Sequence, residues 1–104
     1  MEQVRITPTD LELIKVAFKK HFSTQDHLWL FGSRVDLKKR GGDLDFYIET
    51  MESASTAVDK KMAFVSELWQ NLGDQKIDVV LNLISSPYAL PIYKVAKETG
   101  IQLV

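Results

Sequence analysis

The sequence predicts an α+β (α/β) domain, in which helices flank a small mixed β-sheet. Three observations carry this prediction. Apolar residues recur with helical spacing in residues 9–22 and 55–72, they alternate with polar residues in 43–49, and they run almost unbroken through 77–84. The 104 residues, 45% of them hydrophobic and 26% charged, suit one globular domain spanning residues 1–104.

The first predicted elements are a helix and a short buried strand. Residues 9–12, Thr-Asp-Leu-Glu, fit a capping box, in which the Thr hydroxyl and the Glu carboxylate satisfy free amides of the first helical turn. The helix is therefore expected to begin there. Its apolar stripe comprises Leu11, Ile14, Phe18 and Phe22. Residues His27 to Phe31 are short, apolar and aromatic, which predicts a buried strand that delivers Gly32 and Ser33 at its C-terminal end.

Two further strands are predicted to carry acidic residues. In residues 43–49, Asp43 and Asp45 share one face while the alternating apolar residues occupy the other, which indicates a half-buried strand. Residues 77–84 contain only Asp78 and Asn82 as polar residues, which predicts a central strand covered on both faces. The polar segment 34–42 between the first two strands is expected to be a loop.

The remaining elements are two helices and a short edge strand. The longer helix is expected to begin near Ser55 or Thr56 and to end at Gly73. Its predicted core stripe comprises Val58, Met62, Val65, Leu68, Trp69 and Leu72. A last helix follows the prolines at 87 and 91 and ends at Gly100, and residues 101–104 are expected to form an edge strand.

The three acids form a candidate metal site. Residues two apart on a strand project to the same face, so Asp43 and Asp45 are expected to converge on one cation. If the strand of Asp78 lies beside theirs, all three carboxylates face the same metals, and Asp78 also becomes a possible proton acceptor. Magnesium is the expected cofactor, with two ions when a nucleotide is bound, because it prefers carboxylate and phosphate oxygens.

Carboxylates repel phosphate, so the phosphates of a nucleotide need a separate binding site with hydrogen-bond donors. Gly32 allows close backbone approach, Ser33 supplies amide and hydroxyl donors, and Arg34 adds a charged fork. Each motif alone is weak: paired acids beside Gly41 and Gly42 are commonly solvated turn residues, and a structural hydrogen bond explains a single buried aspartate equally well. Their combination on successive strand ends favours a catalytic site.

The combined motifs resemble the minimal nucleotidyltransferases of the DNA polymerase β superfamily. The matching segments are Leu30-Phe31-Gly32-Ser33-Arg34, Gly42-Asp43-Leu44-Asp45-Phe46 and Ile77-Asp78-Val79-Val80-Leu81. The similarity extends from about residue 9 to residue 104 and implies a polymerase β palm-like fold. It also implies that Gly32 and Ser33 bind nucleotide phosphates and that Asp43, Asp45 and Asp78 bind divalent metal. The chain departs from many members in having nine residues, not ten, between Ser33 and Asp43.

The resemblance further implies a protein partner. Minimal members are typically paired with an all-helical HEPN protein in toxin-antitoxin modules, where the nucleotidyltransferase is the antitoxin and in some systems transfers AMP from ATP to a tyrosine of the toxin. ATP or another nucleoside triphosphate and a HEPN-type toxin are therefore the expected partners. The alternative is a catalytically weak or inactive antitoxin that neutralises its partner by binding alone. Transfer to an aminoglycoside-like small molecule would require an additional binding domain.

Composition narrows the remaining possibilities. The chain has no cysteine, which excludes disulfides and thiolate chemistry. A net charge of −1 disfavours extensive direct binding to nucleic acid. The apolar stretches are too short to span a bilayer, and the first residues lack the layout of a signal peptide, so the cytoplasm is the expected location and no membrane association is expected.

Overall fold

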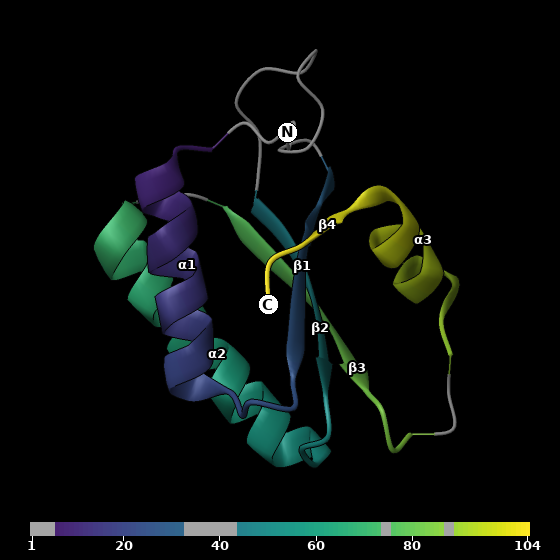
Figure 1. The fold of residues 1–104 in the computed structure, drawn as a ribbon. Helices are drawn as coiled ribbons and strands as arrows, with labels where there is room; N and C mark the ends of the chain where they lie inside the picture. Colours follow the sequence, from purple (N-terminus) through teal and green to yellow (C-terminus); the bar gives the residue numbers. More distant parts are fainter. Residues whose placement is uncertain (1–5, 33–43, 74–75, 87–88) are drawn as a thin grey trace.

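The computed structural model describes residues 6–32, 44–73, 76–86 and 89–104 (Figure 1). In chain order its elements are α1 (Pro8–His21), β1 (His27–Phe31), β2 (Leu44–Thr50), α2 (Ala54–Leu72), β3 (Ile77–Leu83), α3 (Pro91–Thr99) and β4 (Ile101–Gln102). The predicted α+β class is confirmed, because the helices flank a four-stranded mixed sheet. None of the helices in these ranges is long and apolar enough to cross a bilayer.

The strands follow the order β3-β2-β1-β4. β1 pairs antiparallel with both β2 and β4, whereas β2 pairs parallel with β3. Helices α1 and α2 lie on one face of the sheet and α3 on the other (Figure 1). The prediction that β3 is a central strand was wrong, because among the described strands it lies at the edge of the sheet. Its apolar side chains are half-buried.

The N-terminal helix begins two residues earlier than its sequence pattern suggests. Thr7 is the N-cap, and its hydroxyl accepts a hydrogen bond of 3.1 Å from the amide of Asp10. Pro8 follows at the first helical position, where its missing amide hydrogen costs nothing. The proline therefore favours Thr7 over Thr9 as the start of α1. At the other end, the amide of Phe22 donates to the carbonyl of Phe18.

The main core lies between the sheet and the α1–α2 layer. It comprises Ile14, Ala17, Phe18, Phe22, Leu28, Leu30, Leu44, Phe46, Ile48, Phe64, Val65 and Leu68. The predicted core stripe of α2 was only half right. Val65 and Leu68 are buried, but Val58, Met62 and Trp69 are exposed, and Ala57 and Phe64 point inward instead. Two apolar stripes therefore run along α2, and only one of them faces the core.

Polar contacts join the elements at the core's periphery. Nε2 of His21 on α1 lies 2.8 Å from Oε1 of Glu67 on α2. This contact lowers the pKa of Glu67 below its ordinary value. Asp26, before β1, is buried, and its two carboxylate oxygens accept hydrogen bonds from the amides of Ser23 and Met51, each 3.1 Å long. Asp26 thus ties the α1–β1 turn to the β2–α2 turn.

Candidate functional site

The site is centred on two aspartates that face each other across neighbouring strands. In the parallel register of β2 and β3, Asp45 pairs with Asp78. Paired residues of neighbouring strands project to the same face, and strands are about 4.8 Å apart, so the two carboxylates share a small area on the α3 face. The expectation that the strand of Asp78 lies beside that of Asp45 is confirmed. Asp78 is exposed and Asp45 is half-buried, so Asp78 is not the buried carboxylate that the apolar run suggested.

A third residue, Gly32, joins this pair from β1. β1 ends opposite Asp45, with Phe31 as its Cα partner, and Gly32 follows with a φ of +83°. A Cβ atom on Gly32 would collide with the carboxylate of Asp45. Both the positive φ and the close approach require glycine. The sequence pattern predicts Gly32 at a strand end, and the structure places it against the side chain of Asp45.

The other three predicted site residues, Ser33, Arg34 and Asp43, lie outside the described residues. Among the residues that are described, no group of three His, Cys, Asp or Glu side chains is arranged to hold a metal. Asp45 and Asp78 together offer hard oxygen donors, which is the ligand chemistry that magnesium prefers. The described part of the site therefore fits a divalent cation that takes further ligands from elsewhere.

A polar network on the same face supports the strands that carry the acids. The buried Tyr47, two residues after Asp45, donates from its hydroxyl to Oε2 of Glu49 at 2.7 Å and accepts from Nδ2 of Asn82 at 2.9 Å. Burial raises the pKa of Tyr47 well above its ordinary value of 10.0. Glu49 also pairs with Nζ of Lys97 on α3 at 3.0 Å. The network links β2, β3 and α3 below the acids.

Sequence reasoning missed this network, although one signal for it was present. Tyr47 and Glu49 continue the alternation that begins at Asp45, so they had to lie on the same face. Asn82 was visible as a polar residue in an apolar strand. Asn82 reaches the hydroxyl of Tyr47 only because the strand register puts it opposite Glu49. The sequence alone does not determine that register.

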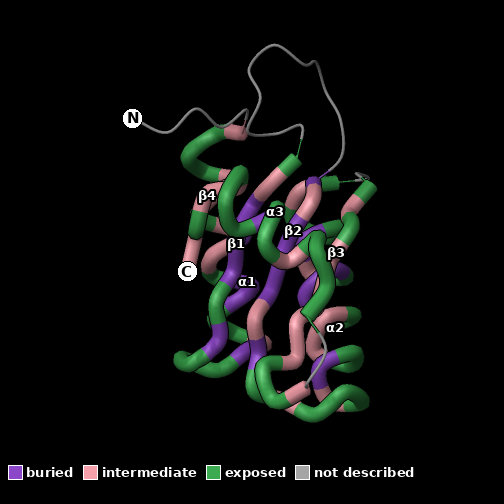
Figure 2. Tube along the Cα trace, turned by 90° about the vertical axis from the view of Figure 1, so that its right-hand side faces the viewer, coloured by how far each residue is buried: buried purple, intermediate pink, exposed green. Residues whose placement is uncertain are grey.

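Helix α3 covers the middle of this face, beside the polar network. Ala96 on α3 packs in a small buried cluster with Trp29 and Tyr47. At its C-terminal end, Gly100 fits tightly, because a Cβ atom there would lie 2.5 Å from the carbonyl oxygen of Ala96 and 2.7 Å from that of Leu30. Asp78 lies near the N-terminal end of β3 and is exposed to solvent. Figure 2 shows α3 in front of the sheet.

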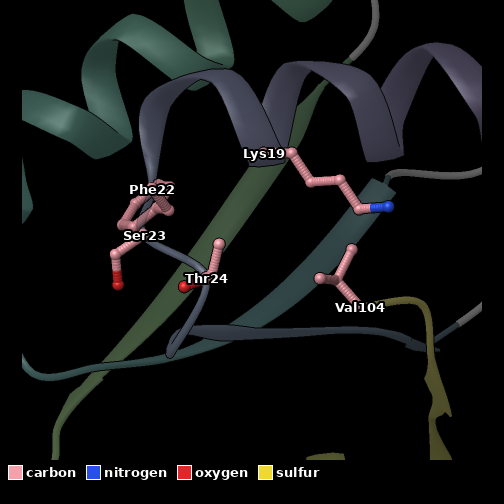
Figure 3. A pocket seen from close by; sticks show the side chains of 5 residues that line it. All are labelled: Lys19, Phe22, Ser23, Thr24 and Val104. Atoms are coloured by element: carbon pink, nitrogen blue, oxygen red, sulfur yellow. The ribbon is translucent and has the colours of Figure 1, made fainter.

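Two cavities lie away from the acids. The first, of about 200 Å³, is lined by Lys19, Phe22, Ser23, Thr24 and Val104 (Figure 3). Leu28 donates its amide to the carbonyl of Val104, so this cavity lies at the end of β1 opposite Gly32. The second, of about 250 Å³, adjoins the C-terminal half of β3 and is lined mainly by apolar residues. Neither cavity is lined by Asp45 or Asp78.

No family model matches the sequence, and no curated protein matches it. The functional interpretation therefore depends on the chemistry and geometry of the acid-bearing face.

Proposed function

We propose that this protein is a magnesium-dependent nucleotidyltransferase that transfers AMP from ATP to a hydroxyl group of a partner protein. The observation that carries the proposal is the register of Asp45 with Asp78, with Gly32 held against the carboxylate of Asp45. Two carboxylates on one face of the sheet, beside a glycine at a strand end, would suit a metal ion and phosphate together. The resemblance of the surrounding motifs to minimal nucleotidyltransferases supports the same reaction.

The residues have distinct proposed roles. Asp45 and Asp78, together with Asp43, would hold magnesium, which neutralises phosphate charge when it is bound. Gly32 lets the nucleotide phosphates approach the backbone, and Ser33 and Arg34 donate hydrogen bonds to them. The acceptor hydroxyl oxygen forms a bond to the α-phosphorus, the bond to pyrophosphate breaks, and Asp78 accepts the hydroxyl proton.

The proposed acceptor is a tyrosine of an all-helical HEPN-type toxin, and the protein is its antitoxin in the cytoplasm. The exposure of Asp78 supports a macromolecular acceptor, because a hydroxyl on another protein's surface can reach it. The two cavities described above are lined by neither Asp45 nor Asp78.

Transfer of label from α-labelled ATP to the partner tests the proposal. With magnesium present, the native protein should label the partner, and Asp45→Asn or Asp78→Asn should reduce the rate at least about 100-fold. Asp59→Asn, at an exposed position on α2, is the matched control and should keep the native rate. If native protein and both site variants neutralise the partner equally and no label moves, the protein acts by binding alone and the proposal fails.

A further inference from the structure

The two aspartates of the candidate site share their row across the sheet with an aromatic residue. Phe31 on β1 is the Cα partner of Asp45, and Asp45 is the partner of Asp78 on β3. Because β2 lies between β1 and β3, Asp45 lies between Phe31 and Asp78. Cross-strand partners project to the same face, with Cβ atoms about 4.5–5.5 Å apart in antiparallel pairs. A ligand bound at the two carboxylates therefore lies beside the Phe31 side chain.

The surroundings of Phe31 hold the residue in place without burying it completely. Phe31 is half-buried, and it packs against the buried cluster that includes Trp29 and Ala96. On the side toward β4 its neighbour is Gly100, where an added Cβ atom would lie 2.9 Å from the Cβ atom of Phe31. A glycine there adds no side chain that could cover the ring. Part of Phe31 thus packs within this face, and part remains accessible to a ligand.

The next row of the same face has a different composition. It consists of Trp29, Tyr47 and Val80, and Ala96 of α3 packs in one cluster with the first two. Phe31 lies outside this apolar row, in the same row as the two aspartates. A row that joins two carboxylates to one aromatic ring suits a ligand that has both a charged part and a flat apolar part.

A nucleoside triphosphate is such a ligand, and its parts match the order of the residues. Gly32 follows Phe31 directly and lies against the carboxylate of Asp45, so phosphates that approach Gly32 are next to Phe31. Only a ribose separates the base of a nucleotide from its α-phosphate, and the base must therefore lie near the bound cation. Trp29 and Tyr47 are buried and one row further away, whereas Phe31 is half-buried and adjoins Asp45.

We propose that the ring of Phe31 stacks on the base of the bound nucleoside triphosphate, so that the site selects a nucleotide over phosphate alone. This role belongs to the site of the proposed transfer and therefore rests on the proposed function. Stacking on an aromatic side chain tolerates any base, because every base has a flat π surface. Phe31 consequently contributes affinity for the nucleotide and does not itself distinguish ATP from GTP.

The other aromatic group in the proposed reaction is the tyrosine of the acceptor, and the order of the row assigns it to the opposite end. Asp78 is exposed, is the proposed proton acceptor and lies on the far side of Asp45 from Phe31. The attacking and leaving oxygens are roughly in line at the α-phosphorus, so they lie on opposite sides of it. With the leaving phosphates at Gly32, next to Phe31, the acceptor lies toward Asp78 and the ring is left for the base.

Isothermal titration of the whole chain with two probes tests this role. The probes are ATP and inorganic tripolyphosphate, each with magnesium, because tripolyphosphate offers the phosphate groups without a base. Phe31→Leu keeps an apolar side chain but removes the ring. It should raise the dissociation constant of ATP at least about 5-fold, the lower end of the loss of one base–aromatic stack, and leave that of tripolyphosphate unchanged. Phe31→Tyr keeps the ring and should bind ATP as the native chain does.

Val80→Ala is the matched control for lost packing. Val80 is also half-buried, lies on the same face and packs against the same cluster as Phe31. The control should lower the midpoint of thermal unfolding and keep the native affinity for ATP. If it weakens ATP binding as much as Phe31→Leu does, lost packing explains both effects and the inference is wrong. Circular dichroism checks the fold of Phe31→Leu, and Phe31→Met, with a flexible side chain that fills irregular gaps, replaces it if it does not fold.

The possible results separate the role of Phe31 from the proposed function. If the native chain binds ATP and Phe31→Leu binds it equally tightly, or loses ATP and tripolyphosphate alike, the ring does not hold the base, although the transfer proposal remains. If Phe31→Leu keeps its affinity for ATP and instead raises the KM for the partner protein, the ring contacts the acceptor and the inference is wrong. A native chain that binds neither probe at millimolar concentration overturns the proposed function and the role of Phe31 with it.

Discussion

Asp45 and Asp78 are direct cross-strand neighbours in the parallel pairing of β2 and β3. Like charges directly opposite each other on adjacent strands destabilise a sheet. A bound cation would convert the repulsion into attraction, which leads to a prediction about stability that needs no activity assay.

Asp78→Asn should raise the stability of the metal-free protein and remove its response to magnesium. Relief of the repulsion is worth about 0.2–1 kcal/mol, toward the lower end because Asp78 is exposed. Thermal unfolding in EDTA and in magnesium measures both effects. Asp59→Asn is the control and should follow the native protein in both buffers. A variant that keeps the full native response to magnesium would show that Asp78 is not a ligand.

Gly32→Ala should damage the site beyond its effect on stability. The substitution strains a residue with a φ of +83° and pushes its Cβ atom into the carboxylate of Asp45. Gly73→Ala is a matched control, because Gly73 has a φ of +85° and a Cβ atom added there would meet nothing within 4 Å. Both variants should lose about 1–3 kcal/mol from backbone strain. Only Gly32→Ala should also lose the stabilisation by magnesium. If both variants lose the magnesium response equally, Gly32 has no special role at the metal site.

Strand positions were the most predictable part of this fold. β1 was expected at His27 to Phe31 and occupies those residues, because a short aromatic run between polar segments has few alternatives. The alternation in β2 correctly put Asp45 on the face opposite Leu44 and Phe46. That Asp45 and Asp78 lie side by side could not be predicted from the sequence alone. It depends on β3 pairing with β2, which the sequence analysis could state only as a condition.

The errors concern surfaces where apolar residues do not face the core. A continuous apolar run predicts burial on both faces, but β3 lies at the edge and its side chains are half-buried. On α2, Val58 and Met62 have the same spacing as a core stripe, and only the position of α1 and the sheet shows that Phe64 points inward. Periodicity identifies apolar rows, but it does not say which partner they contact.

Tyr47→Phe should destabilise the protein by about 1–3 kcal/mol, since it removes the hydroxyl that joins Glu49 to Asn82 and leaves both partners short of a hydrogen bond. Urea unfolding at neutral pH measures the loss. Tyr93→Phe is the comparison, because the hydroxyl of Tyr93 donates to the backbone carbonyl of Leu81 at the sheet edge and joins no pair of side chains there. It should cost less than Tyr47→Phe, and the reverse order would contradict the importance of the network.

The raised pKa of Tyr47 gives the same network a pH dependence. Burial favours the neutral phenol in the folded state, so the folded pKa lies above the unfolded value of 10.0. This contribution to stability is complete below about pH 10 and is lost as the pH rises above that value toward the folded pKa. The native protein should therefore lose stability more steeply than Tyr47→Phe as the pH rises from neutral to about 11. If the stabilities of the two proteins fall in parallel as the pH rises, Tyr47 does not cause this pH dependence.

Asp26→Ala should be among the more destabilising single substitutions outside the apolar core. Asp26 is 1% exposed, and its carboxylate accepts the amides of Ser23 and Met51, which belong to turns far apart in the sequence. Truncation leaves two part-buried amides without their acceptors, at about 1 kcal/mol each. Asp26→Asn keeps one acceptor oxygen and should lose roughly half as much. Hydrogen exchange should locate the damage, with faster exchange at Ser23 and Met51 and little change at Asp45. If both variants unfold at the native urea midpoint, the two turns are held together by apolar packing and Asp26 is not their tie.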